Sequence, residues 1–301
     1  MKILVAGATG QLGLGISRVF AREGQVVAFP RSALDITDHE AVLRTTRETM
    51  PDVIVNCAAY NDVDGAEADP VTAMRVNGLG VHLLAKAANQ IGAVFVHYGS
   101  DFVFDGNTNE PYGESSIPGP QSVYATSKLV GEWFAGGTSR HYVLRVESLF
   151  GGGAEVEVPG RRLGGSLDRM VDAMLEGRPV QAFTDRVVSP SYVPDVAAAT
   201  LGLVRRQAEA GIYHCVNTGL ATWFEVVQVA ASLLGSESRL AQTTLDNVQL
   251  GAVRPRFCAL SNRKLLAAGV PMPTWEDALD RYLAVRRATV ARRVRDRFAT
   301  S

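Results

Sequence analysis

The chain has 301 residues, of which 47% are apolar and 20% are charged, and its formal net charge at pH 7 is −1. This length and composition predict one large α/β unit with an accessory lobe. Because the net charge is nearly zero, we expect no general affinity for nucleic acid or for an anionic membrane surface.

Short β-branched segments alternate with longer helical patterns in the first half of the chain. The predicted strands are residues 2–6, 25–29, 52–56, 94–97 and 142–146. The predicted helices between them are residues 12–23, 38–49, 71–91 and 121–134. This alternation is typical of a parallel sheet with helices on both faces. We therefore predict a doubly wound α/β fold of the Rossmann type.

The second half of the chain no longer alternates strands and helices regularly. A Gly-rich, charged loop is expected over residues 151–165, and helices over 166–176, 193–206 and 222–234. The last helix is expected to run from the N-cap Thr274 to about residue 290. The main domain would comprise 1–150 plus about 181–220, and a smaller substrate lobe about 151–180 plus 221–301. The Arg-rich segment 286–297 is expected to be a solvated helix face or frayed tail, with partner binding as the alternative.

A Gly-rich turn follows the first predicted strand, with glycines at Gly7, Gly10 and Gly13 and with Gln11 and Leu12 between the last two. Glycines at this spacing allow a tight turn and a close approach of the backbone to a pyrophosphate, which the N-terminus of the next helix stabilises. The turn therefore predicts that the main domain binds a dinucleotide.

The residues after the second predicted strand favour NADP(H) over NAD(H). Arg31 and Ser32 stand there, where an acidic residue would bind the ribose of NAD. A guanidinium suits a 2′-phosphate, although Arg31 as a plain surface residue, with NAD(H) as cofactor, is the alternative. The rest of the cofactor is expected beside Asp35, Ile36, Ala58 and Ala59.

Three polar residues carry the predicted chemistry. Tyr124 and Lys128 are four residues apart and share one face of a helix. The ammonium should lower the pKa of the phenol, so that Tyr124 exchanges a proton with a carbonyl or an alcohol near neutral pH. Ser100, at the end of the fourth predicted strand, can donate a hydrogen bond to the same substrate oxygen.

These residues resemble the extended short-chain dehydrogenase/reductase superfamily. Further motifs resemble its reductases that make dTDP-L-rhamnose from dTDP-4-dehydro-L-rhamnose: PDVIVNCAAY at 51–60, SDFVFDG at 100–106, SPSYVPD at 189–195, RPR at 254–256 and WEDAL at 275–279. The resemblance spans nearly the whole chain. It implies the reduction of the 4-keto group of a nucleotide-activated deoxysugar, with hydride passing from the nicotinamide to C4.

Carried over by position, the resemblance implies a role for each site residue. Tyr124 would protonate the 4-oxygen, Lys128 would hold the nicotinamide ribose, and Ser100 would polarise the carbonyl. The dinucleotide would contact Gly10, Gln11, Leu12, Asp35, Ile36, Ala58, Ala59 and Tyr60. The sugar would lie against Ser100, Asp101, Phe102 and Ser148.

Some positions depart from the family pattern and leave alternatives open. Phe102 stands where the family typically has Tyr, and Ser148 where it has Trp, so the sugar could carry different substituents. Gly15 stands where some members have a Glu that takes part in a magnesium-linked dimer. We therefore expect no metal. A homodimer is still expected. A nucleotide-sugar epimerase, or an NADP-binding regulatory subunit like that of methionine adenosyltransferase, are the alternative functions.

The cysteines and the N-terminus predict a cytoplasmic location. Cys57, Cys215 and Cys258 are odd in number and lack the spacing of a zinc site, which fits a reducing cytosol. The first apolar run, residues 3–6, is too short for the core of a signal peptide. We also expect no membrane association, because no segment approaches the roughly 18 apolar residues of a membrane span.

Overall fold

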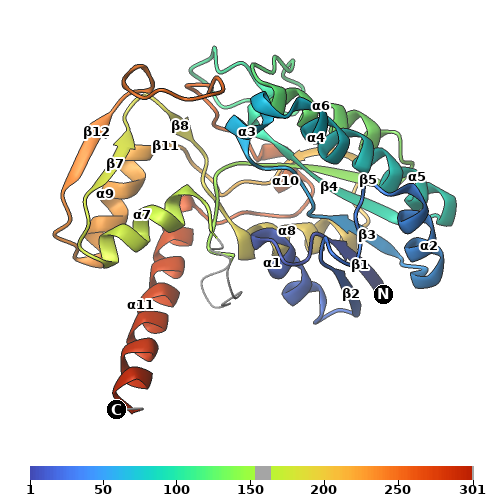
Figure 1. Cartoon of the computed structure of the whole chain (residues 1–301), viewed down its shortest axis with the longest axis horizontal. Coiled ribbons are helices and arrows are strands. Elements are labelled where there is room, and N and C mark those ends of the chain that lie inside the picture. Colours follow the sequence, from blue (N-terminus) through green and yellow to red (C-terminus); the bar gives the residue numbers. More distant parts are fainter. Residues whose placement is uncertain (153–163, 300–301) are drawn as a thin grey trace.

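The computed structural model describes residues 1–152 and 164–299, which form two lobes (Figure 1). In the larger lobe, six described strands form one parallel sheet in the order β10-β5-β4-β3-β1-β2. The strands are β1 (Lys2–Ala6), β2 (Gln25–Phe29), β3 (Val53–Asn56), β4 (Val94–Ser100), β5 (His141–Val146) and β10 (Gly211–His214). The predicted doubly wound α/β class is confirmed.

Helices cover both faces of this sheet, which is why its central strands are mostly apolar. On one face α1 (Gln11–Phe20) packs with α8 (Val193–Arg206), and Val5 and Val55 of the sheet join that core. On the other face lie α2 (His39–Thr49), α5 (Val81–Ile91) and α6 (Val123–Gly136), which pack against one another. Leu4 and Ile54 point into this second core. The alternation of neighbouring strand residues between the two cores holds the parallel strands in register.

The predicted helix over residues 71–91 is helical throughout, but it is not one regular α-helix. The chain forms α4 (Pro70–Met74), then a π-helix, η1 (Arg75–Gly80), and only then α5. A short helix, α3 (Val63–Ala68), precedes them. The apolar periodicity is similar in all these forms, but the wider π turn belongs to the segment that buries the polar side chain of Asn77. Elsewhere the boundaries shift by a few residues: α1 ends at Phe20, and β4 continues to Ser100.

The smaller lobe contains three two-stranded ladders and three helices in the described residues. The ladders pair β6 (Leu149–Phe150) with β9 (Ser191–Tyr192), β7 (Val180–Phe183) with β12 (Leu240–Thr243), and β8 (Val187–Val188) with β11 (Ala221–Thr222). The helices are α7 (Ser166–Leu175), α9 (Trp223–Leu234) and α11 (Trp275–Ala299). Their shared core includes Phe150, Trp223 and Tyr282. The domain boundaries given above stay a prediction.

The helix α11 begins where the sequence predicts, because the Asp277 backbone N–H donates to Thr274 Oγ1 at 3.3 Å. It is longer than predicted and extends away from the lobe (Figure 1). Three short helices, η2 (Asp101–Val103), η3 (Leu245–Asn247) and α10 (Arg263–Ala267), complete the described elements. Most of the predicted loop 151–165, and the side chains of the Arg-rich segment from residue 290 on, lie outside the described residues.

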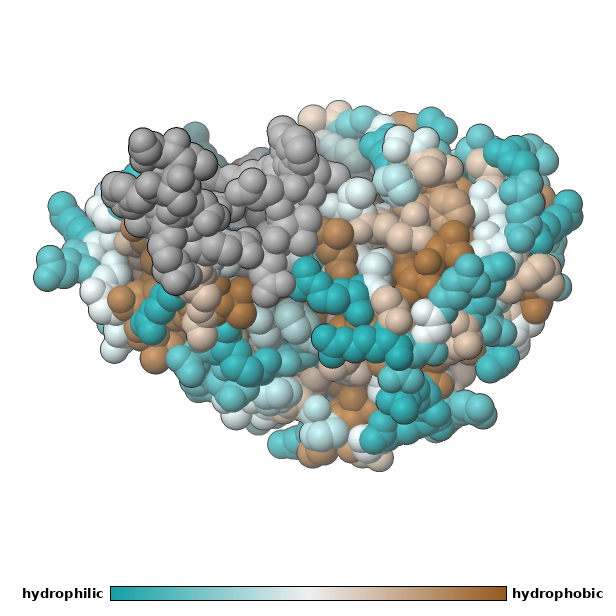
Figure 2. Space-filling view, turned by 90° about the horizontal axis from the view of Figure 1, so that it is seen from below, coloured by the Kyte–Doolittle hydropathy of each residue, from teal (hydrophilic) through white to brown (hydrophobic). Residues whose placement is uncertain are grey.

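None of the described helices combines the length and the apolar character that crossing a bilayer requires. Seen from below, hydrophilic and hydrophobic residues are interspersed over the described surface (Figure 2).

Candidate active site

The turn between β1 and α1 brings the backbone close to the end of β3. Gly7 has a φ of +74°, and a Cβ there would lie 2.5 Å from the backbone nitrogen of Ala58. A Cβ on Gly13 would lie 2.4 Å from the carbonyl oxygen of Gly7, so both positions require glycine. The helix α1 has no side-chain cap at Gly10. Its positive end is therefore suited to an anion such as a pyrophosphate.

A cavity of about 190 Å³ continues from this turn along the ends of β2 and β3. Arg31 and Asp35 lie on its rim, and Ile36 contributes apolar surface. The backbone N–H and the hydroxyl of Thr37 both donate to Asp35 Oδ1 at 2.9 Å. The backbone hydrogen bond lowers the pKa of Asp35 most, and Arg31 adds to it against the effect of burial. This carboxylate therefore stays ionised as an acceptor. The cavity lining consists of Gly7, Thr9, Gly10, Arg31, Leu34, Asp35, Ile36, Cys57, Ala58, Ala59, Tyr60, Asn61 and Val76, and so does not include Ser32.

A second cavity, of about 660 Å³, adjoins the first at the carboxyl ends of β3, β4 and β5. Gly10, Cys57, Ala58, Ala59 and Asn61 line both cavities, which therefore form one crevice. This is the edge where open parallel sheets bind their ligands. The second cavity brings together the sequence-predicted residues Gln11, Leu12, Ser100, Asp101, Phe102, Tyr124, Lys128 and Ser148.

The helix α6 delivers Tyr124 and Lys128 to this second cavity. Its N-cap, Ser122, accepts a hydrogen bond from the Ala125 backbone N–H at 3.2 Å, which fixes where the helix begins. Lys128 is only 4% exposed, and its Nζ donates to the carbonyl oxygen of Tyr98 at 2.6 Å. Burial lowers the pKa of Lys128 to about 8, although Glu132 acts in the opposite direction.

The expectation that Lys128 lowers the pKa of Tyr124 is wrong for this structure. Burial raises the pKa of Tyr124 well above its usual value, and the Asp101 carboxylate raises it further. A hydrogen bond with Ser100 and the charge of Arg254 act in the opposite direction and are weaker. Desolvation dominates because the phenol is buried. Tyr124 is therefore protonated at neutral pH, as a proton donor must be.

A buried polar network that the sequence analysis missed holds α6 in place. The Asn77 side chain accepts from the Tyr60 backbone N–H at 2.8 Å and donates to Ser127 Oγ at 2.9 Å. Ser127 in turn donates to the carbonyl oxygen of Tyr124 at 2.7 Å. Asn77 therefore ties the loop after β3 to the helix α6, which carries Tyr124 and Lys128. Its only sequence signal is an asparagine inside an apolar helical pattern; short π segments of this kind are frequent at functional sites.

An ion pair beneath Lys128 was also missed. Arg145 Nη2 donates to Glu132 Oε2 at 2.8 Å, and Arg145 Nε lies 3.1 Å from both carboxylate oxygens. Both side chains are almost fully buried. Glu132 follows Lys128 by one helical turn, so this pair places a negative charge next to the lysine.

Part of the lining of the second cavity is basic and aromatic. Arg169, Arg186, Arg254 and Trp223 line it. The guanidinium carbons of Arg186 and Arg254 lie 5.7 Å and 5.8 Å from the centre of the Phe102 ring. The Phe102 ring meets Tyr124 edge-on at 5.7 Å between centroids. These arginines come from separate segments, and no sequence spacing links them.

Ser148 also lines the cavity, with a strained backbone. Its φ of +47° lies in the left-handed region, which a serine adopts rarely. Such strain is typical of functional positions, where surrounding structure holds an unfavourable conformation.

The comparisons with known proteins agree with this geometry. The sequence profile of the RmlD substrate binding domain family matches residues 1–287. The chain is 36% identical to a dTDP-4-dehydrorhamnose reductase from Streptomyces griseus over 285 residues, covering 92% of this chain and 91% of the relative. It is 31% identical to the spore coat polysaccharide biosynthesis protein SpsK of Bacillus subtilis (strain 168), covering 95% and 98%.

A solved structure supports the same relation. The crystal structure of dTDP-4-dehydrorhamnose reductase from Bacillus anthracis, in complex with NADP, superposes with a TM-score of 0.87 at 28% identity and covers 94% of this chain and 98% of that one. The resemblance inferred from the sequence motifs is thereby confirmed.

Proposed function

Since this chain belongs to the RmlD substrate binding domain family, we propose that it reduces the 4-keto group of a nucleotide-activated deoxysugar with NADPH, as a dTDP-4-dehydrorhamnose reductase does. One observation carries the proposal. A single crevice joins the Gly-rich turn, the trio of Ser100, Tyr124 and Lys128, and a basic part of the lining.

The cofactor end of the crevice fits a dinucleotide. The N-terminus of α1 has no side-chain cap and follows the Gly-rich turn directly, so its free N–H groups suit a pyrophosphate. Arg31 on the rim of the first cavity supports NADP(H), because a guanidinium binds a 2′-phosphate in a bidentate manner. The NADP bound to the Bacillus anthracis reductase supports the same choice.

The basic part of the lining fits a diphosphate that links a base to a sugar. Arg169, Arg186 and Arg254 all line this cavity, although Arg254 also pairs with Asp64 at 2.9 Å and Arg186 faces Asp101 and Glu147. Trp223 also lines this cavity, with most of its ring packed in the core of the smaller lobe. An acid or alcohol without a phosphate would use none of these charges, which favours a nucleotide sugar as substrate.

The trio of polar residues divides the chemistry. The bound nicotinamide supplies a hydride to the carbonyl carbon. Tyr124 gives its phenolic proton to the carbonyl oxygen as negative charge develops there. Ser100, whose hydroxyl lies beside Tyr124 and Asp101, holds the same oxygen by a hydrogen bond. Lys128, whose buried Nζ donates to the carbonyl oxygen of Tyr98, would hold the nicotinamide ribose.

Turnover of purified protein tests this proposal. We expect NADPH to be oxidised stoichiometrically when dTDP-4-dehydro-L-rhamnose is added, with the 4-hydroxy sugar as product. The variant Tyr124→Phe keeps the ring and should bind NADPH with unchanged affinity while losing about 10²–10⁴-fold in kcat, the usual contribution of a positioned proton donor. NADPH binding without oxidation by any nucleotide 4-keto-sugar would point to a regulatory subunit instead. Interconversion of two sugars without net NADPH loss would point to an epimerase.

A homodimer and a cytoplasmic location belong to the proposal as well. Trp133 on α6 is 69% exposed and Leu79 on the adjoining η1 is 53% exposed, and apolar residues of this size at a surface favour contact with a second copy. Sedimentation should give a dimer that Trp133→Glu dissociates; a monomeric wild type at all concentrations would contradict it. The three free cysteines support a reducing compartment.

A further inference from the structure

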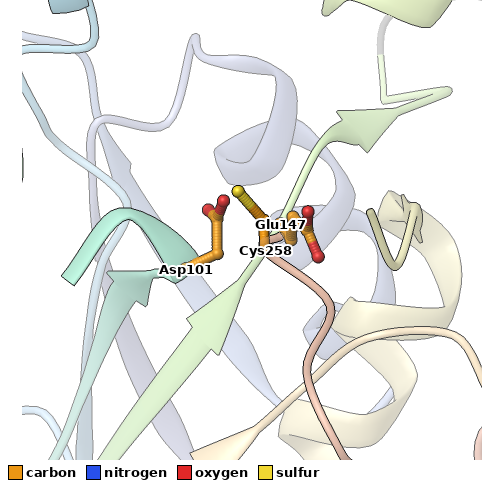
Figure 3. Close-up of side chains that lie close together, drawn as sticks. All are labelled: Asp101, Glu147 and Cys258. Atoms are coloured by element: carbon orange, nitrogen blue, oxygen red, sulfur yellow. The ribbon is translucent and has the colours of Figure 1, made fainter. Parts of the chain in front are cut away.

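A group of acidic and thiol side chains lies behind the catalytic serine. Asp101 follows β4, Glu147 follows β5, and Cys258 comes from a segment far along the chain; the three converge in Figure 3. One ligand-type atom from each lies within 4.8 Å of the others, the one such group among the described residues. All three side chains are buried, with Glu147 only 1% exposed.

Each carboxylate in this group has one satisfied oxygen and one orphaned oxygen. Asp101 Oδ1 accepts from the Ser100 hydroxyl at 3.0 Å, and Glu147 Oε2 accepts from the Ser189 backbone N–H at 2.7 Å. Asp101 Oδ2 and Glu147 Oε1 are buried, and no described residue gives either one a hydrogen bond. A buried carboxylate oxygen without a hydrogen bond destabilises the folded protein, because the charge has lost its water and gained no partner. A proton on either carboxyl group removes one of the two charges.

The local charge balance also calls for one proton. Arg186 is the guanidinium that faces both carboxylates, and its Nη2 lies 3.6 Å from Cys258 Sγ. One guanidinium opposite two carboxylates leaves a single uncompensated negative charge in the interior. Of the other titratable groups, Tyr124 faces Asp101 from α6, and Arg254 lies beyond Tyr124. A divalent cation is the less suitable occupant, because Arg186 already supplies positive charge at this place.

The pKa values agree with a shared proton. Burial raises the pKa of Asp101 to about 6, against the opposing effects of Arg186 and Ser100. Burial, and next the charge of Asp101, raise the pKa of Glu147 well above its usual value. Two carboxyl groups that interact this strongly titrate as one unit. Both shifts favour the protonated form of the pair.

A short path connects this pair to the reaction. The Ser100 hydroxyl donates to Asp101 on one side and interacts with the Tyr124 phenol on the other. A serine hydroxyl has one proton, so it cannot donate to both groups at once. If Asp101 carries the proton, Asp101 becomes the donor and the Ser100 hydrogen turns toward Tyr124.

We propose that Asp101 and Glu147 hold a shared proton that reloads Tyr124 through Ser100 after each reduction, an inference that rests on the function proposed above. Hydride transfer to the carbonyl carbon leaves the electron pair of the C=O bond on oxygen, which takes the Tyr124 proton and becomes the alcohol. The Ser100 proton then moves to the Tyr124 phenolate, and the carboxyl pair returns a proton to the Ser100 oxygen. The doubly ionised pair finally regains its proton from water. Glu147 acts through Asp101 and is a positioning residue.

The variant Glu147→Gln tests the relay. It keeps the size and the neutral charge of the protonated glutamic acid, so folding should be retained, but it has no acidic proton to give. Rapid mixing of the enzyme–NADPH complex with the keto-sugar should show a first turnover at the wild-type rate. Later turnovers should be at least about tenfold slower, because a positioned proton donor typically contributes on the order of 10²–10⁴. Glu147→Asp, which keeps an acid, should restore part of the steady-state rate.

Several results would overturn the relay. A purely structural role for Glu147 would slow the first and later turnovers equally, and equal rates for Glu147→Gln and wild type would exclude any role. Loss of wild-type turnover on chelation, with recovery on adding a divalent ion, would place a cation where the proton is proposed. In wild type alone, rising pH should slow later turnovers more than the first. Absence of turnover by the wild type would count against the proposed function, not against the carboxyl pair.

Discussion

Replacing Lys128 by Met should reveal how much stability the protein gives up to bury a charged catalytic side chain. Lys128 is 4% exposed, and burial lowers its pKa from the usual 10.5 to about 8. Each pKa unit corresponds to about 1.4 kcal/mol, so this lowering corresponds to about 3 kcal/mol. Below pH 8 the native protein carries a proton on Lys128 at that cost; between pH 8 and 10.5 it binds fewer protons than the unfolded chain.

The consequence is a stability difference that depends on pH. Stability rises with pH wherever the unfolded state binds more protons. The free energy of unfolding of the wild type, relative to Lys128→Met, should therefore increase by about 3 kcal/mol between pH 7 and pH 10.5. Titrating groups that do not interact with Lys128 cancel in the difference, whereas Cys57 and His97, whose pKa values Lys128 lowers, contribute to it.

Urea unfolding of the two proteins, without added cofactor, at a series of pH values measures this quantity. At pH 7 the variant should be the more stable protein although it has lost the hydrogen bond to Tyr98, which is worth about 1 kcal/mol, and although it is inactive. A difference that stays constant over the whole pH range would refute the reasoning, since it would mean that Lys128 titrates alike in the folded and unfolded chains.

Three further substitutions test other parts of the site. Arg31→Ala should raise the Kd for NADPH by about tenfold, the value of one charge-assisted hydrogen bond, and leave the Kd for NADH nearly unchanged; equal losses would rule out a 2′-phosphate contact. Arg169→Met should raise the KM for the nucleotide sugar by about tenfold with little change in kcat, and a fall in kcat alone would contradict its phosphate role. Glu132→Gln leaves Arg145 buried without its charged partner and should lower the free energy of unfolding by about 3–5 kcal/mol. The control Glu176→Gln, which breaks a surface ion pair, should lower it by less than about 1 kcal/mol. Similar losses in the two variants would show that the buried pair contributes no more than the exposed one.

Local signals made much of the fold predictable. The strands β1 and β3 are short runs of β-branched and apolar residues between turn residues, and the turn at Gly7 has the only residue type that its positive φ favours. Tyr124 and Lys128 lie where helical spacing places them, lining one cavity. Each of these features depends on a few neighbouring residues, so a pattern read along the chain suffices.

The π turn at Asn77 was not predictable in the same way. Apolar residues recur at nearly the same spacing in a π-helix and in an α-helix, so periodicity cannot separate them. What distinguishes the segment is the set of hydrogen bonds from Asn77 to Tyr60 and Ser127. Those partners come from two other elements, and only the folded chain brings them together.

The sequence by itself determined the fold class, the Gly-rich turn and the placing of Tyr124 and Lys128 on one helix, because backbone dihedrals and helical spacing are properties of short segments. Only the tertiary structure decided the ionisation of Tyr124 and Lys128, and the meeting of Asp101 with Glu147 and Cys258. Charge states depend on how much water remains around a group and on which charges face it. Both are set by elements that pack together from distant parts of the chain, and no local spacing encodes them.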